Sequence, residues 1–436
     1  MQFLYSVNLP NLLYFCFYLL IFLQFRNMTF FEELNDENTT GVALKNIQLK
    51  KNIISFLCRN GSHTIADVCK EVNISVPKVT NLISELINDG LVEDLGKVES
   101  TGGRKPNLYG MVGNSVFFLG VDIKQNHVNI GLTDLQKNLI EIKESIPYKL
   151  ANSQEALTDL INIIKNFIKN INIKKEKILG LGVNLSGRIN HETGYSYSFF
   201  NFNEEPLAKS LEKELNIKTF LENDSRAMAY GEFNSGLVRD EKNVLFLNLD
   251  HGLGIGIMIN SQLYYGKSGF AGEFGHIPLF NNNIICQCGK KGCLETEGSG
   301  WALTRNFIKK IEAGTSSILI EKGKKPLKVD QIEMDHIIDA AIHDDVLAID
   351  LIADIGDKLG RGVALLINIF NPELIIVGGS LSKTGEYLTL PIKSAINKYS
   401  LSLVNNDTVI KLSLLGEKSG VIGACLLARN RLLNLD

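Results

Sequence analysis

The sequence has no large excess of charge, few cysteines and no repeated or low-complexity tract. Its 45 basic and 48 acidic side chains give a formal net charge of −3, so any binding of nucleic acid must come from a local basic patch. Seven unevenly spread cysteines exclude the disulfide framework of a small secreted domain and favour a reduced compartment with one metal or redox cluster. A composition of 45 % apolar and 21 % charged residues also excludes disorder and collagen-like structure.

The amino terminus departs from the rest of the chain. Residues 12–23 form an uninterrupted apolar run, whereas a membrane-spanning helix needs about 20 apolar residues. Positive charge before the run and small residues after it, the marks of a signal peptide, are both missing. We therefore expect residues 1–27 to be an apolar extension that comes from a mis-called start or, alternatively, a membrane anchor. The remaining sequence, from Met28 onward, is typical of a cytoplasmic protein.

Residues 42–110 have the helix spacing of a winged helix-turn-helix. The first predicted helix, 42–59, stops at Asn60-Gly61, and a second begins after Thr64. A third helix, with Ser75 as its N-cap, ends at Asp89-Gly90, and residues 91–112 are then expected to form a β-hairpin wing. The side chains of the last two helices that we expect to point inward are Ile65, Val68, Cys69, Val72, Val76, Val79, Ile83, Leu86 and Ile87.

The predicted third helix leaves polar side chains exposed near its start. A recognition helix contacts base edges mainly through its N-terminal residues, and short polar side chains with one lysine suit such contacts. The glycines at the wing tip let the backbone approach a phosphate, and basic residues beside them can enter a minor groove. The predicted DNA-binding residues are Ser75, Lys78, Thr80, Asn81, Arg104 and Lys105. A small helical protein-interaction domain is the alternative, because the excess of basic residues over 42–110 is small.

Residues 115–436 alternate strand-like and helical stretches, which predicts an α/β domain of two lobes with a cleft between them. We expect lobes at about 115–240 and 241–420, and a closing helix at 420–432. The predicted strands are 116–123, 127–133, 178–184, 244–249, 256–259 and 374–379. The predicted helices are 154–171, 206–215, 226–233, 300–313, 334–344 and 346–369.

The sharpest local signal is a set of one histidine and three cysteines, His276, Cys286, Cys288 and Cys293. These side chains supply the tetrahedral donor set of a zinc site, and glycines at 289 and 292 permit the tight turn that lets the thiolates converge. Four protein ligands leave no position for water, so the zinc is expected to be structural. An incidental cysteine cluster is the alternative, and a redox pair is disfavoured because Cys-x-Cys is not the usual Cys-x-x-Cys spacing.

Two weaker motifs follow strand-like stretches. Asn223 and Asp224, after Glu222, offer the donors and acceptors that suit neighbouring sugar hydroxyls, although such a pair before a helix can simply be an N-cap. The glycine run Gly252, Gly254 and Gly256 is a poor phosphate-loop signal on its own and is equally compatible with a tight turn.

Together these residues resemble the ROK family (repressors, open reading frames and sugar kinases). The resemblance covers residues 42–436 and is specific at 222–224, 252–256, 271–276, 286–295, 371–373 and 378–379. It implies an α/β fold in which an N-terminal winged helix-turn-helix precedes a two-lobed, actin-like or hexokinase-like domain around a sugar cleft. The sugar-binding residues that it implies are Asn223, Asp224, Glu273, His276 and Glu295. One ring nitrogen of His276 would face the zinc and the other a sugar hydroxyl, while Glu273 and Glu295 are alternatively ordinary solvated carboxylates.

The nucleotide half of the implied site departs from the kinases of this family. Their first phosphate loop reads Asp-x-Gly-Gly-Thr, whereas residues 122–126 contain no glycine, and side chains at 124 and 125 would obstruct a phosphate. Asp250 and His251 replace the usual Gly and Thr of the second loop, which leaves Gly252, Gly254 and Gly256 as a remnant. We therefore expect no ATP and no catalytic residue, and Asp224 would be the general base only in a kinase.

These observations predict a sugar-responsive DNA-binding regulator, a repressor without enzymatic activity, that carries one structural zinc per chain. Its expected partners are double-stranded operator DNA, a sugar or sugar phosphate, and further copies of the chain in a homodimer or dimer of dimers. A membrane would be a partner only if residues 3–25 are genuine. The alternatives are an ATP-dependent sugar kinase with an appended DNA-binding domain, and a regulator controlled by docking to another protein.

Overall fold

The computed structural model describes residues 30, 40–97, 106–202, 204–320 and 327–435. The chain divides into two compact units, one ending at Ser115 and the other beginning at Val116. The apolar extension at 1–27 and the wing residues Arg104 and Lys105 lie outside the described residues. Within the described part of the chain, no helix combines the length and the apolar character needed to cross a membrane.

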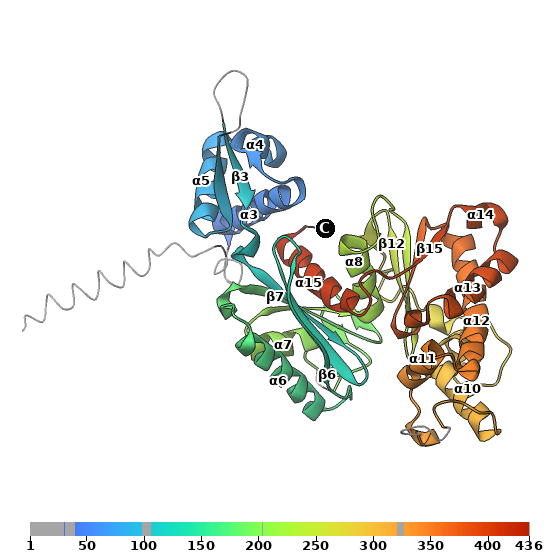
Figure 1. Cartoon of the computed structure of the whole chain (residues 1–436). Helices are drawn as coiled ribbons and strands as arrows, with labels where there is room; N and C mark the ends of the chain where they lie inside the picture. Colours follow the sequence, from blue (N-terminus) through green and yellow to red (C-terminus); the bar gives the residue numbers. More distant parts are fainter. Residues whose placement is uncertain (1–29, 31–39, 98–105, 203, 321–326, 436) are drawn as a thin grey trace, which may run out of the picture. The chain divides into compact units, whose positions relative to one another are not determined.

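In residues 40–97 and 106–115, the first unit combines three helices with an antiparallel sheet of order β1-β3-β2 (Figure 1). Its elements are α3 (Gly41–Asn60), β1 (His63–Thr64), α4 (Ile65–Val72), α5 (Val76–Asn88), β2 (Val92–Lys97), β3 (Asn107–Met111) and the 3-10 turn η1 (Gly113–Ser115). Helix α4 begins with a capping box, in which the Asp67 N–H donates to Thr64 Oγ1 at 3.3 Å and the Thr64 N–H donates to the Asp67 carboxylate at 3.1 Å. Strands β2 and β3 pair as the expected wing.

The core of this unit is smaller than the sequence pattern suggests. Val79, Leu82, Ile83 and Leu86 of α5 are buried, but Val76 is 56 % exposed, so its predicted inward position is wrong. The first turn of α5 projects past the core. In α4 only Val68 is fully buried, and its predicted neighbours Ile65, Cys69 and Val72, like Ile87 of α5, are half-buried. A helix of only eight residues presents too short a face to bury a whole stripe.

The polar face of α5 is also less exposed to solvent than the sequence predicted. Ser75 and Asn81 are exposed, but Lys78 and Thr80 are half-buried. Lys78 Nζ donates to Asn46 Oδ1 of α3 at 2.8 Å, and Thr80 Oγ1 donates to the Val76 carbonyl at 2.9 Å. These two side chains are therefore partly engaged within the unit, which corrects their prediction as freely exposed residues.

The second unit contains two five-stranded sheets with the same internal order. The first sheet, β10-β7-β4-β5-β6, consists of β4 (Phe117–Ile123), β5 (His127–Asp134), β6 (Leu139–Pro147), β7 (Ile178–Leu185) and β10 (Lys218–Asn223). The second sheet, β13-β12-β11-β14-β15, consists of β11 (Val244–Leu249), β12 (Leu253–Ile259), β13 (Gln262–Leu263), β14 (Leu374–Gly378) and β15 (Val409–Leu412). In each sheet an antiparallel meander of three strands is followed by two parallel strands. A small hairpin, β8 (Ile189–Asn190) and β9 (Tyr195–Ser196), extends from the first lobe.

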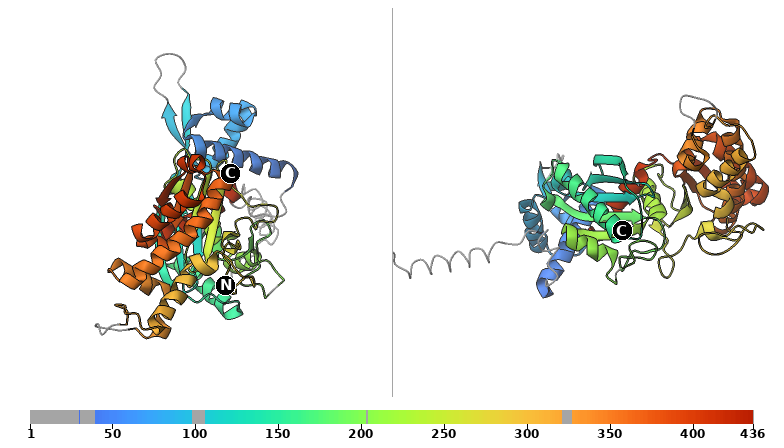
Figure 2. Two further views of the ribbon diagram at one scale, coloured as in Figure 1. Left: turned by 90° about the vertical axis from the view of Figure 1, so that its right-hand side faces the viewer. Right: turned by 90° about the horizontal axis from the view of Figure 1, so that it is seen from below.

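Helices cover both faces of each sheet (Figure 1; Figure 2). In the first lobe α6 (Gln154–Asn170) and α7 (Leu207–Leu215) pack on one face, with the 3-10 turn η2 (Lys175–Lys177) leading into β7. In the second lobe the outer layer is α10 (Gly300–Glu312), α11 (Met334–Ile342), α12 (Val346–Phe370) and α13 (Glu386–Tyr399), with the short elements α9 (Glu295–Gly298), α14 (Ser402–Asn406), η3 (Phe274–His276), η4 (Val329–Gln331) and η5 (Ser380–Thr384). Helices α8 (Asp224–Ser235) and α15 (Lys418–Leu433) pack between the two sheets.

Close backbone contacts fix α15 in this position. A Cβ atom at Gly182 of β7 would lie 2.0 Å from the Ala424 carbonyl oxygen of α15. A Cβ atom at Gly423 of α15 would lie 1.8 Å from the Ala227 carbonyl oxygen of α8. Both distances are too short for any side chain, so glycine is required for the strand and the two helices to approach one another.

The strands and helices predicted from the sequence are present, with ends shifted by a few residues, but several elements were missed. These include β6, β13, α9, α13, α14, β15 and the β8–β9 hairpin, whereas β10 is the strand-like stretch that was expected before Asp224. Of the predicted phosphate-loop remnant, Gly252 lies in the turn between β11 and β12, and Gly254 and Gly256 lie within strand β12. A Cβ atom at Gly254 would be 2.0 Å from Ser225 Oγ, and one at Gly256 would be 2.3 Å from Ala229 Cβ. These two glycines let β12 pack against α8.

Candidate functional site

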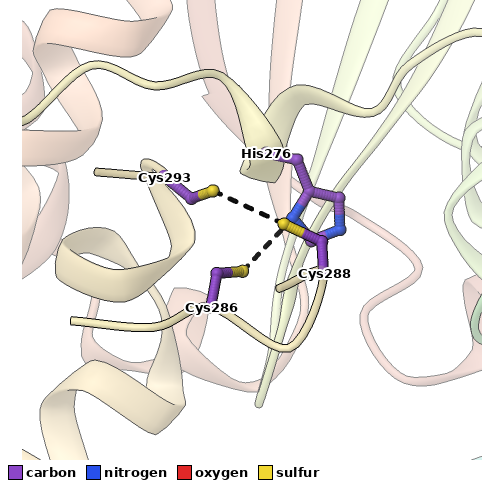
Figure 3. Close-up of side chains that lie close together, drawn as sticks. All are labelled: His276, Cys286, Cys288 and Cys293. Carbon is purple, nitrogen blue, oxygen red and sulfur yellow. Dashed lines mark hydrogen bonds between the residues drawn. The ribbon is translucent and has the colours of Figure 1, made fainter. Parts of the chain in front are cut away.

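The histidine and the three cysteines predicted as metal ligands converge at one place (Figure 3). His276 ends the 3-10 turn η3, and the cysteines lie in the loop before α9. Two isolated bridges, Pro278 with Cys293 and Ile285 with Lys291, fold this loop back on itself. The reversal needs a positive φ at Gly289 (82°) and at Gly292 (76°), a conformation that glycine adopts without strain.

The geometry of this His276–Cys286–Cys288–Cys293 cluster fits zinc. Its four ligand atoms lie within 4.8 Å of one another. Cys288 Sγ is 3.6 Å from Cys293 Sγ, and Cys286 Sγ is 3.4 Å from His276 Nδ1. Tetrahedral zinc with bonds of about 2.3 Å to sulfur places its ligand atoms roughly 3.7 Å apart. Cys286 and Cys293 are buried, at 2 % and 0 % exposure, whereas Cys288 is exposed, so a bound ion would be shielded from water on the side of Cys286 and Cys293.

Two carboxylates predicted to bind sugar lie beside this cluster. Glu273 Oε2 is 3.7 Å from His276 Nε2, and Glu295 Oε1 is 3.6 Å from Cys286 Sγ. The other Glu295 oxygen accepts a hydrogen bond from the backbone N–H of Leu253 at 3.2 Å. Glu295 therefore connects the cluster to strand β12, whereas the Glu273 side chain is 50 % exposed.

The other two predicted sugar residues lie at the start of α8. Asn223 is its N-cap, since Asn223 Oδ1 accepts from the Arg226 N–H at 3.2 Å, while Nδ2 donates to the Gly187 carbonyl at 3.1 Å. Asp224 Oδ1 accepts from the Ser225 N–H at 2.7 Å. The other Asp224 oxygen, Oδ2, has a longer contact of 3.4 Å with Asn248 Nδ2. Asn223 therefore caps α8, while Asp224 Oδ2 is still available to accept a hydrogen bond from a ligand.

Strand β12 links these two groups of predicted sugar residues. Gly254 packs on Ser225, the neighbour of Asp224, and the adjacent Leu253 N–H binds Glu295. The structure therefore arranges the start of α8, the β11–β12 turn and the metal cluster around one strand.

An ionic network behind this site was missed by the sequence analysis. Glu222, only 2 % exposed, accepts from Arg226 Nε at 2.7 Å, from Arg431 Nη2 at 2.5 Å and from the Tyr265 hydroxyl at 3.0 Å. Burial alone would raise the pKa of Glu222, but the two guanidinium groups outweigh it and lower the pKa to about 2. Arg226 also donates to the Gly269 and Ile189 carbonyls. The network thus holds the end of β10 against α15 and two loops.

Lys124 lies between the two lobes, in the loop that follows β4. Its Nζ is 3.5 Å from Asp122 Oδ2 at the end of β4 and 3.9 Å from Asp250 Oδ2 after β11. The side chain is 10 % exposed. The sequence identified this segment by its lack of glycine, but only the structure shows which carboxylates the lysine contacts.

Comparison with known families agrees with this architecture. A winged helix-turn-helix DNA-binding model matches residues 48–93, and the ROK family model matches residues 118–431. The chain belongs to the ROK family. The family resemblance and the fold class predicted from the sequence are therefore confirmed, with a ROK domain following an N-terminal winged helix-turn-helix.

Relatives of this ROK protein include regulators and kinases. The xylose repressor of Caldicellulosiruptor bescii is 30 % identical over 84 % of this chain and 92 % of that protein. A crystal structure of a ROK family transcriptional regulator, a homolog of the E. coli MLC protein, matches with a TM-score of 0.73 and 26 % identity over 89 % of this chain and 97 % of that one. A ROK family glucokinase from Streptomyces griseus, in complex with glucose and AMPPNP, matches with a TM-score of 0.64 and 27 % identity over 72 % and 99 % of the two chains. The likeness to the regulator extends over more of this chain than the likeness to the kinase.

Proposed function

We propose that this ROK protein is a sugar-responsive transcriptional repressor rather than an enzyme. The DNA-binding family match and the likeness to a xylose repressor over most of both chains support this function. The observation that carries it is the position of Lys124 between Asp122 and Asp250. A lysine side chain held there obstructs the close backbone approach to nucleotide phosphate that glycine-containing loops provide.

The proposed sugar site keeps its hydrogen-bonding groups. Its residues are Asn223, Asp224, Glu273, His276 and Glu295, with His276 shared by the metal cluster. His276 Nδ1 faces Cys286, and Nε2 faces Glu273. A zinc ion held by His276 and the three cysteines would fix the ring in this orientation and leave Nε2 directed toward a sugar hydroxyl. The ion would be structural, because the protein supplies all four ligands.

In the proposed mechanism a homodimer places two winged domains on a palindromic operator. The residues offered for the base contacts are Ser75 and Asn81, with Lys78 and Thr80 beside them. Sugar binding between the lobes would favour one lobe arrangement and change the spacing of the two recognition helices. Such coupling requires that the sugar bind the two arrangements with different affinities.

A gel-shift assay tests this proposal. An operator is selected from random double-stranded DNA with the full chain, and xylose, glucose and N-acetylglucosamine are titrated into the complex. We expect one sugar to release the DNA. Asp224→Asn should require at least about tenfold more of that sugar, because a hydrogen bond to a charged acceptor is lost. Asp159→Asn, a matched change on the exposed face of α6, should respond like the wild type.

Failure to select any DNA, or release by none of the sugars, would contradict the proposed function. A coupled assay with ATP and the same sugars addresses the kinase alternative. We expect no turnover. A turnover of about 1–100 s⁻¹, the range of dedicated kinases, would instead assign Asp224 as the general base of a sugar kinase.

A further inference from the structure

Lys124 is a buried cation that carboxylates from both lobes share. Asp122 belongs to the first sheet and is 0 % exposed, and neither of its oxygens has a hydrogen-bond partner. Asp250 follows β11 of the second sheet and is 26 % exposed. The Lys124 ammonium lies within 4 Å of both carboxylates and is 3.8 Å from Met228 Sδ of α8.

The carboxylate of Asp122 is enclosed between this lysine and α15. The start of α15 packs directly on it, and a Cβ atom at Gly420 would lie 2.6 Å from Asp122 Oδ2. Burial raises the pKa of Asp122 to about 6, even though Lys124 lowers it. Burial alone would lower the pKa of Lys124, but Asp122 and Asp250 raise it above its usual range. The lysine therefore stays charged and its charge is engaged by the two carboxylates.

The surroundings of Lys124 carry further negative charge. Asp224 and Glu417 also act on Asp122 and Lys124. A second lysine nearby, Lys383, is already paired with Glu417 at 2.9 Å. A sugar hydroxyl can donate a hydrogen bond to Asp224, but a phosphate ester at that hydroxyl would place a dianion beside Asp224 and the Asp122–Lys124–Asp250 cluster. Like charges placed together in a partly desolvated site cost several kcal/mol.

We propose that Lys124 is a specificity-determining residue whose charge is committed to Asp122 and Asp250, so that the site takes an uncharged saccharide and rejects the corresponding sugar phosphate and nucleotides. This inference rests on the proposed sugar-binding function and narrows it. Lys124 lies within 4 Å of one carboxylate from each lobe. It does not bind an anionic ligand, because both neighbouring carboxylates already neutralise it.

Calorimetric titration of the full chain tests the assignment with matched pairs of probes. Glucose is compared with glucose 6-phosphate, N-acetylglucosamine with N-acetylglucosamine 6-phosphate, and AMPPNP is titrated separately. We expect one sugar to bind at least about 100-fold more tightly than its 6-phosphate, and AMPPNP to give no heat. Asp250→Asn removes one negative charge and releases Lys124, so the preference should fall by about tenfold or more. Lys124→Met should increase the preference for the sugar over its 6-phosphate.

Glu176→Gln is the matched control, because the substitution removes the same charge. Glu176 is exposed and lies in η2 before β7. The variant should keep the wild-type preference. If the 6-phosphate binds as tightly as the sugar, or if Asp250→Asn behaves like Glu176→Gln, the inference is wrong while the proposed function stands. If Asp250→Asn does not fold, a weaker preference in Lys124→Met overturns the inference independently. If no member of any pair binds and xylose gives no heat either, the sugar-binding function itself fails.

Discussion

At the scale of single residues, some side chains of the proposed sugar site form hydrogen bonds that stabilise the fold. Others keep an atom available for hydrogen bonding to a sugar. Asn223 uses its carbonyl oxygen to cap α8 and its amide to reach Gly187, so much of its hydrogen-bonding capacity serves the fold. Asp224 keeps one oxygen with only a long contact to Asn248. We therefore expect Asp224 to contribute more to sugar affinity than Asn223, whose main effect is to orient its neighbour.

The metal cluster gives a prediction at the same scale. Cys293→Ser replaces a thiolate ligand by a poor zinc ligand, so we expect zinc content to fall from one ion per chain to well below half. The free energy of unfolding should also fall by several kcal/mol, because binding of a structural ion to the folded state stabilises it. Atomic absorption and urea unfolding measure the two effects.

Cys69→Ser is the control for this substitution, because Cys69 lies in α4 of the first unit and outside the metal cluster. It should retain full zinc content. Wild-type protein that carries no zinc after purification in zinc-containing buffer, or a Cys293→Ser variant that retains it, would count against the metal assignment.

At the scale of elements, the sequence predicted features that depend on short-range patterns. It did not predict contacts between residues far apart in the chain. The four ligands of the metal cluster fall within eighteen residues, and their spacing predicted them. The Glu222–Arg431 pair joins residues 209 positions apart, and no local pattern signals it. Helix α13 was missed because Pro391 lies inside it, and proline argues against a helix interior. Val76 was misplaced because periodicity gives the apolar face of a helix but not how far the core extends along it.

The recognition helix α5 gives a prediction at this scale, on the proposed function. Asn81 is exposed one turn beyond the start of the helix, where an amide can contact a base edge. Asn81→Ala should weaken operator binding by about tenfold or more, since one good base contact contributes roughly 1–3 kcal/mol. Asn88→Ala removes the same group from the exposed end of the same helix and should bind as the wild type does. Fluorescence anisotropy with labelled operator measures both, and equal affinities would exclude Asn81 from the base contacts.

At the scale of the whole molecule, the ROK domain repeats one sheet order in its two lobes and packs α8 and α15 between them. No repeat is visible in the sequence, because the two sheets share a topology and not a set of residues. The start of α8 carries Asp224, and the start of α15 packs on Asp122. The position of these two helices therefore determines where the proposed sugar site and the Lys124 cluster lie relative to each other.

The contact between α15 and β7 can be tested with two glycines on the same strand. Gly180 and Gly182 both face α15, but a Cβ atom at Gly180 would sit at ordinary distances, 3.5 Å from Phe118 Cδ1 and 3.6 Å from Ala428 Cβ, whereas one at Gly182 would lie 2.0 Å from the Ala424 carbonyl oxygen. Gly182→Ala should therefore push α15 away from the sheet and lower the free energy of unfolding by about 1–3 kcal/mol or more. Gly180→Ala should change it by less than about 1 kcal/mol, because the added methyl group meets no backbone atom at short range. Urea unfolding followed by circular dichroism measures both variants, and equal losses would show that α15 does not depend on this close approach.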